Sequence, residues 1–167
     1  GNAAGAQSLV NTFTSNVQYQ PSVAGYGGGY IVAWTSSGNL DGNGYDIYTQ
    51  RFNNDGSTNG GEVRVNTTTL GGHQQDAQIA ARADGSYVVV WVDQSGADGG
   101  SYGVYAQRYS SAGVGAGEFR VNSFTTGAQY EPQLAMLSDG GFVVVWRSDN
   151  QDGSSAGVYA QRYDASG

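Results

Sequence analysis

The sequence predicts an all-β fold made of three four-stranded antiparallel units of the β-propeller blade type. Three observations support this prediction: a repeat of about 55 residues, strand-like patterns without helical periodicity, and one strand per repeat that is apolar on both faces. The repeat is clearest in the hexapeptide VYAQRY, which stands at 104–109 and 158–163 and has the looser copy IYTQRF at 47–52. The tryptophans keep the same period, at Trp34, Trp91 and Trp146.

Each unit contains four strand patterns in a fixed order. The first is rich in small apolar residues, the second ends in the tryptophan, the third contains the hexapeptide, and the fourth reads EVRVN or EFRVN. In two units an Asp-Gly pair separates the first two strands, which is a strong hairpin signal because both residues tolerate positive φ. We therefore expect one repeat domain over 1–167, divided into an N-terminal strand at 1–14 and repeats at 15–70, 71–126 and 127–167.

The second strand decides between all-β folds. Tyr87, Val89 and Trp91 lie on one face of it, and the valines between them lie on the other. An antiparallel sheet with one wet face would alternate apolar and polar residues. A strand that is apolar on both faces fits a propeller blade, which packs between two neighbours. A β-trefoil or β-prism monomer is the alternative with internal threefold symmetry.

The two ends of the sequence complement each other. The third repeat stops after its third strand, and QSLVN at 7–11 resembles the fourth strand of the other repeats. We expect this N-terminal strand to complete the last blade, as in propeller ring closure. Because three blades cannot close a ring, a homodimer with six blades is the hypothesis, and a fragment of a longer propeller is the other explanation. The first residue, Gly1, suggests a processed or excised piece.

Composition excludes several classes of protein. There is no cysteine, the formal charge is −7, and all seven cations are arginines. An acidic surface repels phosphate, which argues against nucleic acid and anionic membranes as partners. No apolar run is long enough for membrane insertion. We expect an extracellular or cell-surface bacterial protein.

The motifs DGGFVVVW, GVYAQRYDASG and GEFRVN resemble repeats of large secreted bacterial proteins of the repeats-in-toxin type, including adhesins. The resemblance covers the whole chain. It implies calcium-rich extracellular surroundings and an adhesive or scaffold role, and it brings no catalytic motif. The G-G-x-G-x-D calcium repeat of those toxins is missing from this sequence.

The loops after the second strands suggest calcium. Asp and Asn side chains on a glycine-rich loop are hard oxygen ligands of the kind Ca²⁺ prefers. The alternative is that Asp-Gly simply forms turns. The candidate ligands are Asn39, Asp41, Asn43 and Asp46 in the first loop, with Asp98 and Asp152 in the other two.

Aromatic and amide side chains suggest glycan binding on the same loop face. The tryptophans could stack on sugars, although packing between blades is the favoured reading because a buried Trp contributes a large apolar area. Tyr45 and Tyr102 lie within the loops and are freer to meet a ligand. Gln74 and Gln129 complete the candidate ligand-binding set.

No catalytic constellation stands out from the repeat. The acids that break the repeat are Asp76, Asp93, Glu131 and Asp149, and two of them, Asp76 and Glu131, follow a repeated Gln by two residues. The expected function is a non-catalytic, lectin-like binding or adhesion module, with a purely structural repeat as the alternative and a glycosidase-like enzyme as the third reading. The Arg and Gln of VYAQRY recur in every unit and are expected to tie strands and blades together.

Overall fold

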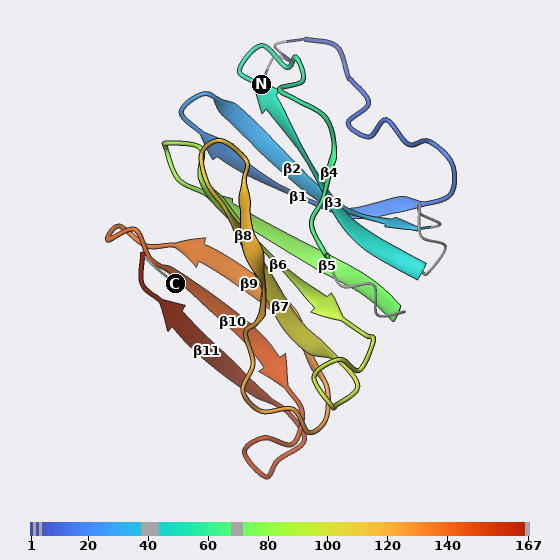
Figure 1. The fold of residues 1–167 in the computed structure, drawn as a ribbon, viewed down its shortest axis with the longest axis vertical. Helices are drawn as coiled ribbons and strands as arrows, with labels where there is room; N and C mark the ends of the chain where they lie inside the picture. Colours follow the sequence, from blue (N-terminus) through green and yellow to red (C-terminus); the bar gives the residue numbers. More distant parts are fainter. Residues whose placement is uncertain (2, 4, 38–43, 68–71, 166–167) are drawn as a thin grey trace.

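The chain folds into three antiparallel groups of strands that lie side by side as blades (Figure 1). A short parallel pairing of Gly44 and Tyr45 with Gly72 and His73 links the first two groups into one sheet. The computed structural model describes residues 1, 3, 5–37, 44–67 and 72–165. Blade 1 contains β1 (Gln18–Tyr26), β2 (Gly29–Ser37), β3 (Gly44–Asn53) and β4 (Val63–Arg64). The prediction of an all-β fold is confirmed, and the described residues contain no helix long and apolar enough to cross a bilayer.

Blades 2 and 3 repeat this order. Blade 2 contains β5 (Gly72–Ala81), β6 (Tyr87–Asp93), β7 (Gly103–Tyr109) and β8 (Gly115–Arg120). Blade 3 contains β9 (Gln129–Met136), β10 (Phe142–Ser148) and β11 (Gly157–Tyr163), in the order β11-β10-β9. Successive blades are joined through their first strands, since β1 contacts β5 and β5 contacts β9. This arrangement is that of propeller blades and differs from the trefoil or prism alternatives.

Apolar side chains fill the two spaces between blades. Every residue of β6 is buried, as the pattern with two apolar faces predicts. One core joins Ile31, Ala33 and Ile47 of blade 1 to Val89 and Trp91 of blade 2. A second core joins the other face of blade 2 to blade 3, through Val88, Val90, Phe142, Val144 and Trp146.

The turns between first and second strands follow the Asp-Gly signal. Gly85 and Gly140 have φ values of 86° and 85°, in the left-handed region that a side chain at these positions would strain. The carboxylate of Asp84 accepts hydrogen bonds from the backbone N–H and hydroxyl of Ser86, which fixes the turn.

The N-terminal segment is the main departure from expectation. Residues 7–11 are not a strand, and they do not pair with β11 of the same chain. Instead Val10 packs against Val32, Trp34 and Phe52 on the outer face of blade 1. A single chain therefore leaves its third blade with three strands among the described residues.

Two of the three arginines of the repeated hexapeptide join neighbouring blades, as expected. Arg51 of β3 donates to the carbonyl oxygens of Ser111 and Gly85 in blade 2, at 2.7 and 3.3 Å. Arg108 of β7 donates in the same way to Asp164 and Ala165 in blade 3, at 3.2 and 3.3 Å.

Candidate active site

A β-bulge interrupts the first strand of every blade at the same place. The pairing register shifts between Tyr19 and Ser22 in β1 and between Gln75 and Gln78 in β5, and β9 shifts likewise against β10. The bulged residues adopt left-handed backbone conformations that are uncommon outside glycine. They are Gln20, Asp76 and Glu131, with φ values of 52°, 57° and 56°.

Such a conformation costs on the order of 1–3 kcal/mol and often marks a functional site. A bulge also re-aims a side chain that would otherwise alternate with its neighbours. Because the first strands of adjacent blades contact one another, the bulges bring Asp76 and Glu131 into one region. The acid two residues after the repeated Gln thus occupies the bulged position of the strand.

The electrostatics of Asp76 separate it from the other acids. Its Oδ1 accepts a hydrogen bond from Gln20 Nε2, and its backbone N–H donates to Gln20 Oε1 at 3.2 Å. Partial burial raises the pKa of the Asp76 carboxyl, and the negative charge of Glu131 raises it further. The two carboxyl groups therefore lie near enough for their charges to interact.

Both acids line a cavity of about 390 Å³ between blades 2 and 3. Polar, aromatic and acidic side chains dominate its wall, which is the composition of a site that orients a polar ligand. Three of its residues, Val92, Tyr102 and Ala128, come from the ends of strands and the loops beside them. The lining is Gln75, Asp76, Val92, Gln94, Tyr102, Ala128, Tyr130, Glu131 and Asp149.

A third carboxylate, Asp149, is held rigidly on the cavity wall. The Tyr130 hydroxyl donates to both of its oxygens at 3.1 Å, and Arg147 Nε lies 3.6 Å from Oδ1. The Arg147 guanidinium also lies over the Tyr130 ring, 4.7 Å from its centroid. Arg147 and Asp149 are both departures from the repeat, and they converge here with Tyr130, which the sequence analysis did not single out.

The fourth acid that breaks the repeat has a structural role. Asp93 is buried, accepts a hydrogen bond from Gln74 Nε2 at 3.0 Å and caps the backbone N–H of Ser95 at 2.7 Å. These bonds occupy its carboxylate and keep it out of the cavity lining.

The tryptophans do not offer surfaces to a ligand. Trp34, Trp91 and Trp146 are 4%, 0% and 6% exposed, and each stacks on the tyrosine opposite in the third strand of its blade. The glycan-stacking reading for them is corrected, because their rings fill the apolar faces of the blades.

Gln74 and Gln129 are likewise structural. Both are buried, and each accepts a hydrogen bond from an asparagine that follows the fourth strand: Asn66 at 3.2 Å and Asn122 at 3.0 Å. Since these bonds hold each blade to the next, neither amide is available to a ligand.

The two loop tyrosines differ from each other. Tyr45 is half-buried against the rings of Tyr19 and His73. Tyr102 is 38% exposed and lines the cavity that holds Asp76 and Glu131. Of the predicted ligand-binding residues, Tyr102 is the one that the structure brings to the candidate active site.

The predicted calcium ligands do not converge among the described residues. Asn39, Asp41 and Asn43 lie outside the described ranges. Asp46 is buried and accepts a hydrogen bond from Asn66, and Asp98 is buried and caps Gly100. Asp152 accepts hydrogen bonds from the backbone N–H and the hydroxyl of Ser154, and these bonds lower the pKa of the Asp152 carboxyl. In 1–37, 44–67 and 72–165, apart from residues 2 and 4, no three His, Asp or Glu side chains form a metal cluster.

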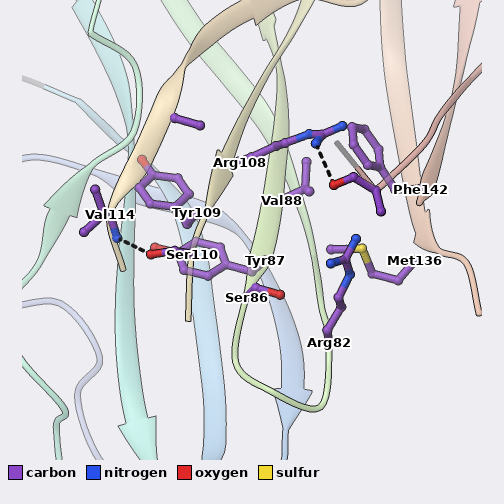
Figure 2. Close-up of a pocket in the computed structure, with 12 residues that line it drawn as sticks. Arg82, Ser86, Tyr87, Val88, Arg108, Tyr109, Ser110, Val114, Met136 and Phe142 are labelled. Atoms are coloured by element: carbon purple, nitrogen blue, oxygen red, sulfur yellow. Dashed lines mark hydrogen bonds between the residues drawn. The ribbon is translucent and has the colours of Figure 1, made fainter. Parts of the chain in front are cut away.

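A second cavity, of about 240 Å³, lies at the other end of the blade strands from the first cavity. Figure 2 shows the residues that line it. Arg108 crosses it over the ring of Phe142, 4.8 Å from the centroid, and donates to a backbone carbonyl of blade 3. Its lining contains two arginines and no carboxylate. This cavity therefore belongs to the arginine contacts between blades and lacks the groups for acid–base chemistry.

Comparison with solved structures finds the same fold in an enzyme. The chain is similar to an endo-arabinase from Bacteroides thetaiotaomicron, with a TM-score of 0.55 and 14% identity over 91% of this chain. It spans 58% of that enzyme, whose fold is a five-bladed β-propeller. A GH43 endo-arabinanase from Bacillus licheniformis matches with a TM-score of 0.43 and 15% identity, over 90% of this chain and 75% of that one. No family model and no curated protein matches the sequence.

At this identity the likeness shows the β-propeller fold alone. The expected function nevertheless needs correction: the neighbour with a TM-score of 0.55 is named as an endo-arabinase, which contradicts the expected non-catalytic adhesion or lectin module and favours the third reading, a glycosidase-like enzyme. The same finding contradicts the expectation that the chain is not an enzyme. The resemblance to repeats-in-toxin proteins stays a prediction, as do the extracellular location and calcium binding.

Proposed function

We propose that the chain forms the catalytic part of a glycoside hydrolase whose acid–base pair is Asp76 and Glu131. One observation carries the proposal: two carboxyl groups on equivalent bulges share one cavity, and burial together with the charge of Glu131 raises the pKa of Asp76. Glycosidases need such a pair, with one carboxyl protonated and the other ionised.

The roles follow from the environments. The raised pKa of Asp76 suits it to act as the general acid that protonates the glycosidic oxygen. Glu131 is exposed and supplies the second carboxyl group, on the other side of the scissile bond. The Gln20 side chain, bonded to Asp76 through both of its polar atoms, positions the acid.

The cavity wall suits a carbohydrate chain. Tyr102 and Tyr130 offer aromatic surface, and Gln75 and Gln94 offer amide donors and acceptors for hydroxyl groups. We infer that the substrate is a polysaccharide, and arabinan is the first to test because the similar enzymes are named for it.

The test is release of reducing ends from a panel of plant and microbial polysaccharides that includes arabinan. Asp76→Asn and Glu131→Gln each remove one acid at nearly constant volume, and each is expected to lower the rate by about 10²–10⁴-fold. Asp84→Asn is the matched control, because Asp84 is an exposed turn aspartate that does not line the cavity. A panel without any cleavage, or full activity in both variants, would refute the proposal.

We also propose that two copies of the chain complete a ring of six blades. Propeller rings contain about four to eight blades, and one copy supplies three. A ring completed in this way would surround the bulged first strands and give the cavity a continuous wall.

Calcium remains a proposal of its own. The acids of the second and third loops form local hydrogen bonds, so binding would depend on the first loop. Calorimetric titration with Ca²⁺ is the test. Absence of heat, together with a melting temperature that a chelator leaves unchanged, would remove calcium from consideration.

A further inference from the structure

The third strand of blade 3 differs from its two equivalents in one respect. Ile47 of blade 1 and Val104 of blade 2 are both fully buried, whereas Val158 at the same position of β11 is 82% exposed. Because the sequences around these residues are nearly identical, the difference arises from what covers them.

A Val-Asn pair covers the buried positions. In blade 2, Val121 N–H donates to the Val104 carbonyl, and Val104 N–H donates to Asn122 Oδ1, each at 2.8 Å. Val65 and Asn66 form the same two bonds with Ile47 in blade 1, each at 2.8 Å. For β11, the described part of the chain supplies no such pair.

The N-terminal segment contains a Val-Asn pair that has only half of these contacts. Val10 packs on the outer face of blade 1, as Val65 and Val121 pack in the cores between blades. Asn11 Nδ2 lies 3.4 Å from Gln18 Oε1, the contact that Asn66 and Asn122 form with their own glutamines.

The next residue continues the correspondence. Thr12 N–H donates to Glu62, as Thr67 N–H donates to Glu118 at 2.9 Å. The N-terminal segment therefore contacts blade 1, the blade that follows it in sequence. Among the described residues, no hydrogen bond joins it to the third strand of a preceding blade.

Arg162 of β11 likewise differs from its equivalents, because within the described part of the chain it makes no contact with a next blade. Arg51 and Arg108 reach backbone carbonyls in the next blade, but Arg162 pairs with Asp139 of its own blade. Its side chain is 59% exposed. Beside it, Val143 and Val145 of β10 are half-buried on the face that points away from blade 2.

We propose that Val10 and Asn11 of a second copy dock on Val158 of β11, with Val10 N–H donating to the Val158 carbonyl and Val158 N–H donating to Asn11 Oδ1. This inference rests on the proposed two-copy ring and specifies its contact. Each copy carries both halves, so the contact forms twice about a twofold axis and leaves no half unmatched.

The register gives a sharp test. In blade 2 Ala106 pairs with Phe119, and by the repeat Ala160 pairs with Ser8 of the second copy. The chain has no cysteine, so Ser8→Cys with Ala160→Cys introduces the only thiols. Mild oxidation is expected to give a covalent dimer, whereas the matched pair Ser8→Cys with Val114→Cys, which is out of register, is expected to remain uncrosslinked.

Solution mass separates this contact from the ring itself. Light scattering of the full chain is expected to give twice its 17.4 kDa. Val158→Asp is expected to give the single-chain mass, while Val114→Asp, at an equally apolar residue that is 66% exposed, keeps the dimer. Asn11→Ala is expected to weaken dimerisation by about tenfold or more.

The outcomes are distinguishable. A wild-type chain that stays at the single-chain mass up to high micromolar concentration overturns both the two-copy ring and this contact. A dimer that Val158→Asp leaves intact, with no disulfide in the cysteine variant, overturns the contact and spares the ring. Neither result bears on the hydrolase proposal, which is read from the activity of Asp76→Asn and Glu131→Gln.

Discussion

The left-handed conformation of Glu131 predicts the sign of the stability difference between two variants at this position. The perturbation is Glu131→Gly compared with Glu131→Ala. Both remove the same exposed carboxylate, and they differ only in whether a Cβ remains at a φ of 56°.

The magnitude follows from two opposing terms. A Cβ in the left-handed region costs about 1–2 kcal/mol, which Gly relieves. Gly also gains freedom in the unfolded chain, which destabilises the fold by about 0.5–1 kcal/mol relative to Ala. The Gly variant should therefore be more stable than the Ala variant by about 0.5–1 kcal/mol, whereas in an ordinary strand it would be less stable by about that amount.

The assay is urea unfolding followed by tryptophan fluorescence at one fixed protein concentration, because association would shift the midpoint. Both variants are expected to be inactive on any polysaccharide that the wild type cleaves. An Ala variant as stable as the Gly variant, or more stable, would refute the claim that the bulge stores strain at this position.

Three further predictions concern the surrounding residues. The folded-state pKa of Asp76 is raised above 3.8, so the protonated form stabilises the fold at low pH. That stability is lost as pH rises through the raised pKa. Asp76→Asn should therefore gain stability relative to wild type between pH 3.8 and 7, measured by thermal unfolding. Asn122→Ala removes the acceptor of the Val104 N–H and the donor to Gln129 Oε1, and it should lower the free energy of unfolding by about 1–3 kcal/mol in urea. Tyr102→Ala should leave the melting temperature unchanged and raise KM, since the ring is exposed at the cavity.

The sequence predicts the blades well because their determinants are local and repeated. Period-2 patterns, Asp-Gly turns and the strand that is apolar on both faces each specify an element without reference to distant residues. The arginine contacts between blades are also predictable, because a charged residue that recurs in every repeat has a repeated partner. The number of blades in the ring cannot be predicted in this way, since no residue pattern within one blade depends on how many blades the ring contains.

The site was harder to predict for a physical reason. Asp76, Glu131 and Asp149 are departures from the repeat, but a departure does not reveal where a side chain points. A β-bulge reverses that direction at one residue, and no residue type here marks it, since Gln, Asp and Glu occupy equivalent positions. The tryptophans were easier to notice, yet a large apolar residue at a repeated position mostly reports packing.

The order of the three bulges around a ring leads to a last prediction. Gln20 lies beside Asp76 and is bonded to it, and Asp76 is followed by Glu131 in the next blade. If two copies close the ring, the residue that follows Glu131 is Gln20 of the second copy, which would stand to Glu131 as Asp76 stands to Gln20. The second copy would then supply a positioning amide to the Glu131 side chain. We expect Val158→Asp, at a residue that does not line the cavity, to lower kcat in parallel with the loss of dimer. Dilution of the wild type below its dimerisation constant should reproduce the effect, while Val114→Asp should not. Full activity in a monomeric Val158→Asp chain would show that blades 2 and 3 suffice and that the amide of the second copy plays no part.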